Sequence, residues 1–222
     1  MYSPTMAESQ LLKKDLFGEI WQISAGEQFH IVRDAGTAGV YVRWLARRLL
    51  HREARVLAAM EAIDGVPQLI RAEPDRLTRS FLPGLPMQRS RPTDPQYFKA
   101  AARLLRLLHH NGVVHNDLAK EPNVLVCNDG TPAFIDFQLA LFAPRRGRLF
   151  RLLAYEDLRH LLKHKRSYCP QSLTHRELRI LDNPSFASRV FRSTVKPAYL
   201  FITRRILGWA DREGAANRGD QS

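Results

Sequence analysis

Alternating apolar and polar positions near the N-terminus predict a pair of β-strands. The two segments are Lys14–Ile23 and Gln28–Asp34, and Ala25-Gly26 marks the turn between them. Within the second segment, Phe29 and its neighbours alternate in the manner of a strand. Residues 1–12 show no such pattern and are interpreted as a loose leader.

A long helix and a second strand pair follow. Residues 42–63 are rich in Leu, Ala, Arg and Glu, and Gly65 and Pro67 end this segment. Pro67–Ala72 and Leu77–Phe81 then predict two more strands. The first part of the chain is therefore expected to be a strand-rich unit that carries one helix.

Proline and glycine concentrate between residues 81 and 86 more than anywhere else, which predicts a hinge. The expected organisation is a domain over residues 1–82 and a second domain over residues 83–222. The second domain is mainly helical, so the fold class is α+β. Its predicted helices span residues 94–111, 149–165, 174–181 and 198–211.

Most of the candidate chemistry lies around a predicted β-hairpin. Val124–Cys127 and Pro132–Ile135 read as short strands, and Asn128-Asp129-Gly130-Thr131 is a strong turn signal between them. Such a hairpin is expected to place Asn123 and Asp136 opposite each other at its open end. Cross-strand neighbours have Cβ atoms about 5 Å apart.

An amide oxygen and a carboxylate at this spacing suit Mg²⁺, which prefers oxygen ligands and keeps positions open for phosphates. Asp117 precedes the hairpin and is placed to act as a base or an orienting carboxylate. His115 is placed to hold the loop through a hydrogen bond to the backbone. Each residue alone also has a structural interpretation, as a cap or a core histidine, but their combination favours a site.

The sequence His115-Asn116-Asp117-Leu118, followed by Asn123 and then by Ile135-Asp136-Phe137-Gln138, resembles the catalytic loop and metal-binding motif of protein-kinase-like enzymes. It is most similar to the small RIO-type kinases and the bacterial lipopolysaccharide core sugar kinases. The resemblance covers roughly residues 12–165 and is specific in residues 113–138. It implies a two-lobed protein-kinase-like fold with a small β-rich N-lobe and a mainly helical C-lobe.

The resemblance also implies phosphoryl transfer with ATP and Mg²⁺ as cofactors. Asp117 matches the base that orients the acceptor hydroxyl, with His115 beside it in the catalytic loop. Asn123 and Asp136 match the metal ligands. Lys120 is similar to the lysine that neutralises the transferred phosphate.

The residues expected to bind the nucleotide depart from the family pattern. Arg33 occupies the position of the expected strand lysine and stands 20 residues before Glu53, which matches the helix glutamate that pairs with that lysine. The alternatives are an ordinary edge-strand charge for Arg33 and a helix-surface residue for Glu53. Gly18 is the only sign of a phosphate loop.

Two further departures lie in the catalytic segment. The loop from Asp117 to Asn123 is one residue longer than the usual spacing, and Gln138 replaces the glycine that follows Asp-Phe, which favours a fixed segment. Only about ten residues separate Asp136 from the next predicted helix, so the activation segment is expected to be truncated. Asp157 on that helix is a candidate to support the catalytic loop.

The net charge of +12 is uneven, because residues 139–222 hold 17 Lys/Arg and 7 Asp/Glu. This excess favours an acidic partner, and the arginines at 145, 146, 148 and 151 are candidates to attract an acidic substrate. Residues 196–212 mix basic and apolar side chains, as in a helix on an anionic membrane or one docked on the protein.

Two cysteines, no secretory signal and no long apolar segment favour a cytoplasmic protein, with peripheral contact at the inner membrane face as an open option. The first functional hypothesis is a protein serine/threonine kinase. The alternatives are a kinase of a lipopolysaccharide core sugar and a nucleotide-binding pseudokinase, the latter because of Arg33 and the poor glycine loop. Nucleic acid is disfavoured as a partner because few aromatic residues lie between the basic ones.

Overall fold

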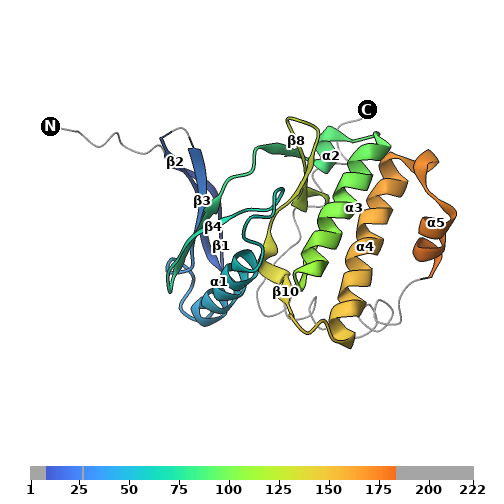
Figure 1. Ribbon diagram of the computed structural model, residues 1–222. Coiled ribbons are helices and arrows are strands. Elements are labelled where there is room, and N and C mark those ends of the chain that lie inside the picture. The colour runs from blue at the N-terminus through green and yellow to red at the C-terminus, as the bar shows by residue number, and fades with distance from the viewer. Residues whose placement is uncertain (1–8, 27, 184–222) are drawn as a thin grey trace, which may run out of the picture. The chain divides into compact units, whose positions relative to one another are not determined.

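The computed structural model describes residues 9–26 and 28–183. The chain up to Leu181 forms one compact unit in which antiparallel sheets pack with helices, which confirms the predicted α+β class (Figure 1). Among the described helices, none has both the length and the apolar character to cross a bilayer. The predicted helix at residues 198–211 lies outside the described residues, as does the segment at residues 1–8.

The N-terminal sheet has five antiparallel strands in the order β1-β2-β3-β5-β4. All of its strands come from the first 80 residues, so the predicted strand-rich unit is present; the domain boundary at residue 82 stays a prediction. The bounds are β1 Ser9–Asp15, β2 Gly18–Ala25, β3 Gln28–Asp34, β4 Leu69–Ala72 and β5 Arg76–Ser80.

The prediction of one strand over Lys14–Ile23 was wrong, and so was that of a loose leader for residues 9–12. The chain makes a tight turn after Asp15, whose carboxylate accepts a hydrogen bond from the Phe17 amide at 2.8 Å. Gly18 closes this turn with a φ of +120°, and a Cβ there would lie 2.0 Å from the Asp34 carbonyl oxygen. Only glycine fits this position.

Helix α1 (Arg43–Ala58) packs one apolar face against the rest of the unit. Ala46, Leu50, Ala54 and Leu57 are buried, and they recur at the spacing of an amphipathic helix. The helix ends five residues before the predicted limit, because the chain reverses through Ala62, which has a φ of +62°.

The proline- and glycine-rich segment that predicted a hinge contains a short strand, β6 (Gly84–Pro86). It pairs with β8 (Val124–Cys127), which in turn pairs with β9 (Pro132–Phe134). The backbone approaches closely here, because a Cβ on Gly84 would lie 2.9 Å from the Val126 carbonyl oxygen. The predicted hairpin is thus confirmed and gains a third strand.

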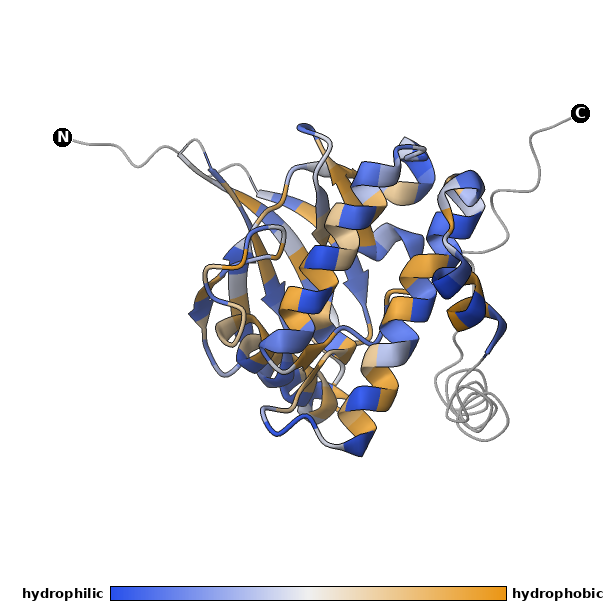
Figure 2. Ribbon diagram, turned by 45° about the vertical axis from the view of Figure 1, so that its right-hand side comes forward, coloured by the Kyte–Doolittle hydropathy of each residue, from blue (hydrophilic) through white to orange (hydrophobic). Residues whose placement is uncertain are grey.

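The remaining elements are mostly helical, and the limits of the predicted helices in this part lie within three residues of the observed ones. Asp94 caps α3 (Pro95–His110) by accepting a hydrogen bond from the Gln96 amide at 2.8 Å. Helix α3 packs beside α4 (Arg148–Tyr168), and Figure 2 shows hydrophobic and polar bands alternating along both helices. The other elements are α2 Met87–Ser90, β7 Val113–Val114, η1 Glu121–Asn123, η2 Phe137–Leu139, β10 Leu141–Phe142, η3 Pro170–Ser172 and α5 His175–Asp182.

Candidate active site

The catalytic loop after β7 is anchored by a buried carboxylate on α4. Asp157 accepts hydrogen bonds from the backbone amides of His115 at 2.7 Å and Asn116 at 2.8 Å. Asn116 has a φ of +62°, so these two bonds hold a left-handed turn in place. The proposed support of the loop by Asp157 is therefore present.

His115 is buried and links the catalytic loop to the strand that follows the hairpin turn. Its Nε2 atom lies 3.0 Å from the Ile135 carbonyl oxygen, and its ring centroid is 4.6 Å from that of Phe137. This is the predicted hydrogen bond to the backbone. Its burial leaves His115 in contact with the backbone and with Phe137.

Asp117, Lys120 and Asn123 lie within seven consecutive residues and contact one another through Asp117. We call this group the loop cluster. Asp117 Oδ2 lies 2.9 Å from Lys120 Nζ and accepts a hydrogen bond from Asn123 Nδ2 at 2.9 Å. Asn123 Nδ2 also donates to the Asp117 carbonyl oxygen at 3.0 Å. The extra residue in this loop is absorbed by η1, so it does not separate the three side chains.

The register of the hairpin corrects one prediction. Val124 pairs with Phe134, and the Ile135 amide donates to the Asn123 carbonyl oxygen at 3.0 Å. Ile135, not Asp136, is therefore opposite Asn123. Asp136 lies one residue further along, where a φ of +64° turns the chain into η2.

Arg33, Glu53 and Arg79 form a second group, which we call the arginine cluster. Arg33 Nη1 donates to Glu53 Oε2 at 3.0 Å and lies 3.9 Å from Asp136 Oδ1. The Glu53 side chain is completely buried and that of Arg33 is 12% exposed. The interpretations of Arg33 as an edge-strand charge and of Glu53 as a helix-surface residue are thus wrong, because both side chains face the interior.

Arg79 on β5 is the member of this cluster that sequence reasoning missed. It is buried, and its Nε atom forms an ion pair of 3.5 Å with Glu53 Oε1, without a hydrogen bond. Burial lowers the pKa of the Arg79 guanidinium, and the charge of Glu53 opposes this change. The one sign in the sequence is an arginine in the middle of a predicted short strand. This sign does not indicate that Arg79 pairs with Glu53.

The β1–β2 turn covers a small cleft that reaches the arginine cluster. Gly18, Arg33 and Gln138 are among the residues that line it. The side-chain amide of Gln138 lies against the Arg33 guanidinium, and its oxygen accepts hydrogen bonds from Nη1 and Nη2 when the amide oxygen and nitrogen are exchanged. Gln138 thus occupies part of the guanidinium fork, and this contact is consistent with the predicted fixed segment.

Comparison with known families identifies the reaction class. Residues 40–179, more than half of the chain, match the phosphotransferase enzyme family (APH). The chain belongs to this family. The matched region contains Glu53, the loop cluster and Asp136, whereas Gly18 and Arg33 lie before it. The search of curated proteins finds no match to this phosphotransferase.

The residues of this phosphotransferase fit a divalent cation at the end of the hairpin. Asp136 Oδ1 is buried without a hydrogen-bond partner, so it offers an unused acceptor. Asn123 uses its amide nitrogen on Asp117, which leaves its amide oxygen for a ligand. In the described residues, no group of three or more His, Cys, Asp or Glu side chains forms a metal cluster. Asp136 and Asn123 therefore each offer one oxygen to an ion whose other ligands are phosphates and water.

Two further contacts of the phosphotransferase fix the segment after Asp136. Arg52 on α1 donates to the carbonyl oxygens of Ala140 at 2.6 Å and Leu139 at 3.0 Å. Asn116 Nδ2 donates to the same Leu139 oxygen at 3.2 Å. These residues were missed from the sequence, because the contacts join positions 23 or more residues apart.

Proposed function

We propose that this phosphotransferase transfers the terminal phosphate of ATP to an alcohol hydroxyl in the presence of Mg²⁺. The observation that carries the proposal is the loop cluster, in which the Lys120 ammonium and the Asn123 amide both contact the Asp117 carboxylate, while Ile135, the residue before Asp136, bonds to the Asn123 backbone. A magnesium ion held by Asn123 and Asp136 would neutralise negative charge on the phosphates.

The side chains of the loop cluster have separate parts in this reaction. Asp117 orients the acceptor hydroxyl and accepts its proton. Lys120 places positive charge next to Asp117, where the transferred phosphate carries negative charge. Arg33, held by Glu53, points a second cation toward Asp136 and orients the donor phosphates.

We take a protein serine or threonine as the first acceptor class, because the segment from His115 to Leu118 resembles that of protein-kinase-like enzymes. A lipopolysaccharide core sugar is the second class. The short connection between Asp136 and α4 supports it, since a truncated activation segment offers little surface for docking a peptide. A two-lobed arrangement around the cleft is part of the same proposal.

The test measures phosphate transfer from labelled ATP by the full chain to a protein acceptor and to a core oligosaccharide. Asp117→Asn is expected to lower kcat about 10²–10⁴-fold, the usual contribution of a positioned base. Asp94→Asn is the matched control, because asparagine caps a helix as well as aspartate does. Equal activity of Asp117→Asn and the unaltered chain would refute the proposal.

A nucleotide-binding pseudokinase is the alternative, and the contact of Gln138 with Arg33 favours it because this contact competes with phosphate for the guanidinium. Thermal unfolding separates the two possibilities. A shift in Tm by ATP that needs Mg²⁺, together with transfer to either acceptor, supports the enzyme. A shift without transfer or hydrolysis supports the pseudokinase.

A further inference from the structure

The loop that leads into α1 exposes apolar side chains at adjacent positions. Tyr41, Val40 and Trp44 are 93%, 75% and 66% exposed, and they are the three most exposed large hydrophobic residues in the described part of the chain. All three fall within five consecutive positions. Single exposed apolar residues are ordinary, but a concentration of this kind marks an interaction surface.

Positive charge surrounds this apolar group. Arg47 and Arg48 are exposed on the next turn of α1, and Arg47 forms an ion pair with Asp75 before β5, so Arg48 carries the charge argument. No Asp or Glu occurs between residues 35 and 52. Cations near a helix N-terminus oppose the helix dipole, and α1 has no acidic residue in its first turn. An anionic partner would relieve this repulsion.

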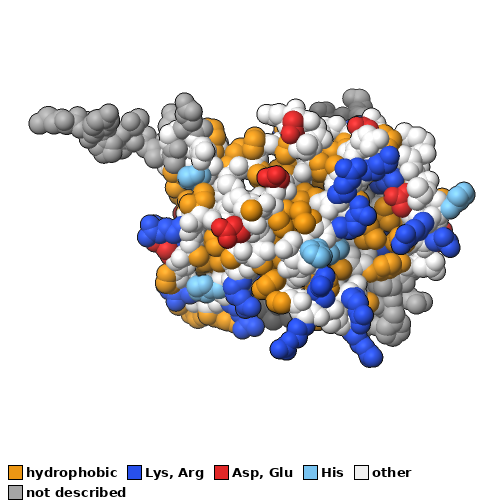
Figure 3. Space-filling view, in the orientation of Figure 1, with side chains coloured by type: hydrophobic (Ala, Val, Ile, Leu, Met, Phe, Trp, Pro, Cys, Tyr) orange, Lys and Arg blue, Asp and Glu red, His pale blue; other side chains and the backbone are white. Residues whose placement is uncertain are grey.

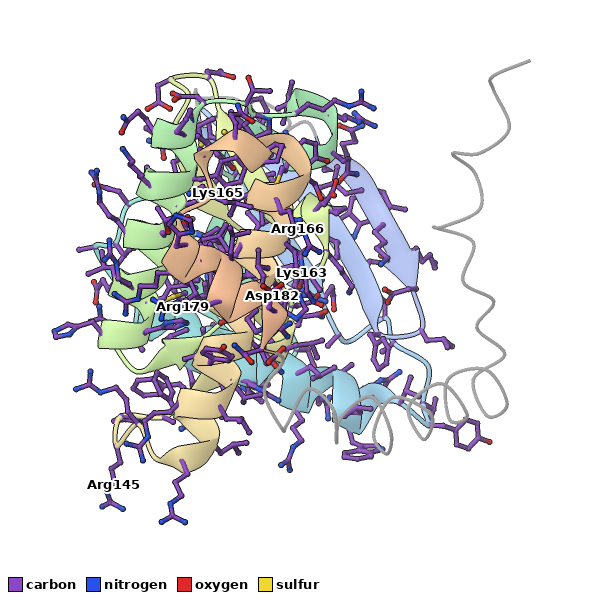
Figure 4. All side chains as sticks on the ribbon, turned by 90° about the vertical axis from the view of Figure 1, so that its right-hand side faces the viewer. Arg145, Lys163, Lys165, Arg166, Arg179 and Asp182 are labelled. Atoms are coloured by element: carbon purple, nitrogen blue, oxygen red, sulfur yellow. The ribbon has the colours of Figure 1, made fainter. Side chains whose placement is uncertain are left out.

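A second basic and apolar segment lies toward the same end of the molecule. Helix α1 contacts β10, and the chain reaches Arg145 three residues after β10. Leu149, at the start of α4, is 61% exposed. Figures 1 and 4 place α1 and the start of α4 at the lower end, where Arg145 projects away from the body. Figure 3 shows Lys and Arg side chains along this lower edge.

We propose that residues 40–48 are a membrane-contact segment that binds an anionic phospholipid surface. Tyr and Trp rings suit the boundary between headgroups and acyl chains, and arginines suit the phosphates above it. The apolar side chains protrude from the surface, so a bilayer can accept them without a complementary pocket. Residues 35–52 contain no acidic side chain, and the carboxylate bound to the segment, Asp75, is neutralised by Arg47, so repulsion from an anionic surface is small.

This contact has a consequence for the site, because the same helix carries Glu53. Trp44 and Glu53 lie nine residues apart on α1, and Glu53 holds Arg33. Docking through the start of α1 therefore places the arginine cluster near the membrane surface. An acceptor attached to that surface would be delivered to this end of the molecule.

The experiment is co-sedimentation of the full chain with vesicles of phosphatidylcholine alone or mixed with phosphatidylglycerol. The double variant Tyr41→Ser/Trp44→Ser is expected to bind the mixed vesicles at least about tenfold more weakly, since two aromatic side chains no longer insert. Arg48→Gln is expected to weaken binding to the mixed vesicles about fivefold, with no change on phosphatidylcholine alone.

Leu107→Ser is the matched control, because Leu107 is 44% exposed on α3 and lies outside the proposed segment. Leu107→Ser should bind vesicles as well as the unaltered chain does. All variants should have the same Tm as the unaltered chain. The proposal is overturned if the unaltered chain does not bind, or if the double variant binds as well as the control. Self-association without lipid that the double variant abolishes would also overturn it. No ATP is present, so this result is independent of phosphate transfer.

Discussion

The loop cluster and the arginine cluster hold their charged groups in opposite ways. Asp117, Lys120 and Asn123 lie within seven consecutive residues, and the Lys120 side chain is 61% exposed. Arg33, Glu53 and Arg79 come from two strands and a helix, and all three are almost fully buried. Water screens the Lys120 end of the first set, although the Asp117 side chain is only 12% exposed, whereas the second set depends on mutual compensation. We therefore expect the loop cluster to affect catalysis most and the arginine cluster to affect stability as well.

Glu53→Gln is expected to give the largest loss of stability. Its removal leaves Arg33 and Arg79 in the interior with Asp136, 3.9 Å from Arg33, as the remaining nearby carboxylate. Breaking a buried ion pair in this way costs about 3–5 kcal/mol. Urea unfolding measures this value. Asp117→Asn removes an ion pair with the exposed Lys120 and keeps the side-chain size, so it should change the free energy of unfolding by less than about 1 kcal/mol. Equal losses of unfolding free energy in the two variants would contradict the proposed difference between the two clusters.

Asp157→Asn tests the support of the loop cluster. The asparagine side chain has one acceptor oxygen, so one of the His115 and Asn116 amides loses its buried partner at a cost of about 1–3 kcal/mol. Both kcat and Tm should fall. Asp129→Asn, at the exposed turn of the hairpin, serves as the control and should leave kcat unchanged. A fall in Tm with unchanged kcat would show that this carboxylate does not position the loop.

Arg33→Lys sharpens the role of the guanidinium. A lysine ammonium cannot reproduce the planar fork that reaches Glu53, Asp136 and Gln138 together. We expect kcat to fall about tenfold, equivalent to one charge-assisted hydrogen bond of about 1.5 kcal/mol. The KM for ATP and kcat should be measured separately. A higher activity of Arg33→Lys would instead mean that the contact between Gln138 and Arg33 limits the activity of the unaltered chain.

His160 on α4 provides the smallest effect, which is absent at neutral pH. Burial lowers the pKa of this histidine from 6.5 to about 4. As the pH falls from 6.5 toward 4, the unfolded chain binds a proton that the folded chain does not, so the free energy of unfolding decreases. Between pH 6.5 and 4 the Tm of His160→Gln should therefore fall less than that of the unaltered chain. Thermal unfolding from pH 7 to 4 measures this difference. Identical pH profiles would contradict the assignment.

The parts of the site that could be predicted depend on short-range contacts. A turn sequence between two short strands specifies the hairpin, and the loop cluster closes within seven residues. Local composition and the stop at Gly65 and Pro67 predicted the helix on which Glu53 lies, and the helix of Asp157 was predicted as well. In each case the signal comes from neighbours along the chain.

The parts that could not be predicted depend on register and on distant partners. Asp136 lies one residue beyond the position opposite Asn123 that was expected for it. The sequence does not show that the pairing of β8 and β9 stops before Asp136, or that Asp136 adopts a left-handed backbone conformation. Strand β6 was hidden in a proline- and glycine-rich segment, and its pairing with β8 joins positions more than 35 residues apart.

The amino-acid order alone determined the α+β class and the hairpin, and it named Asp117, Lys120 and Asn123 as candidate site residues. Only the tertiary structure decided that Arg33 and Arg79 share one buried carboxylate, that Gln138 contacts Arg33, and that the aromatic residues before α1 protrude. The physical reason is that burial and ion pairing are properties of packed elements. A strand and a helix acquire a common interior only when the whole sheet has formed around them.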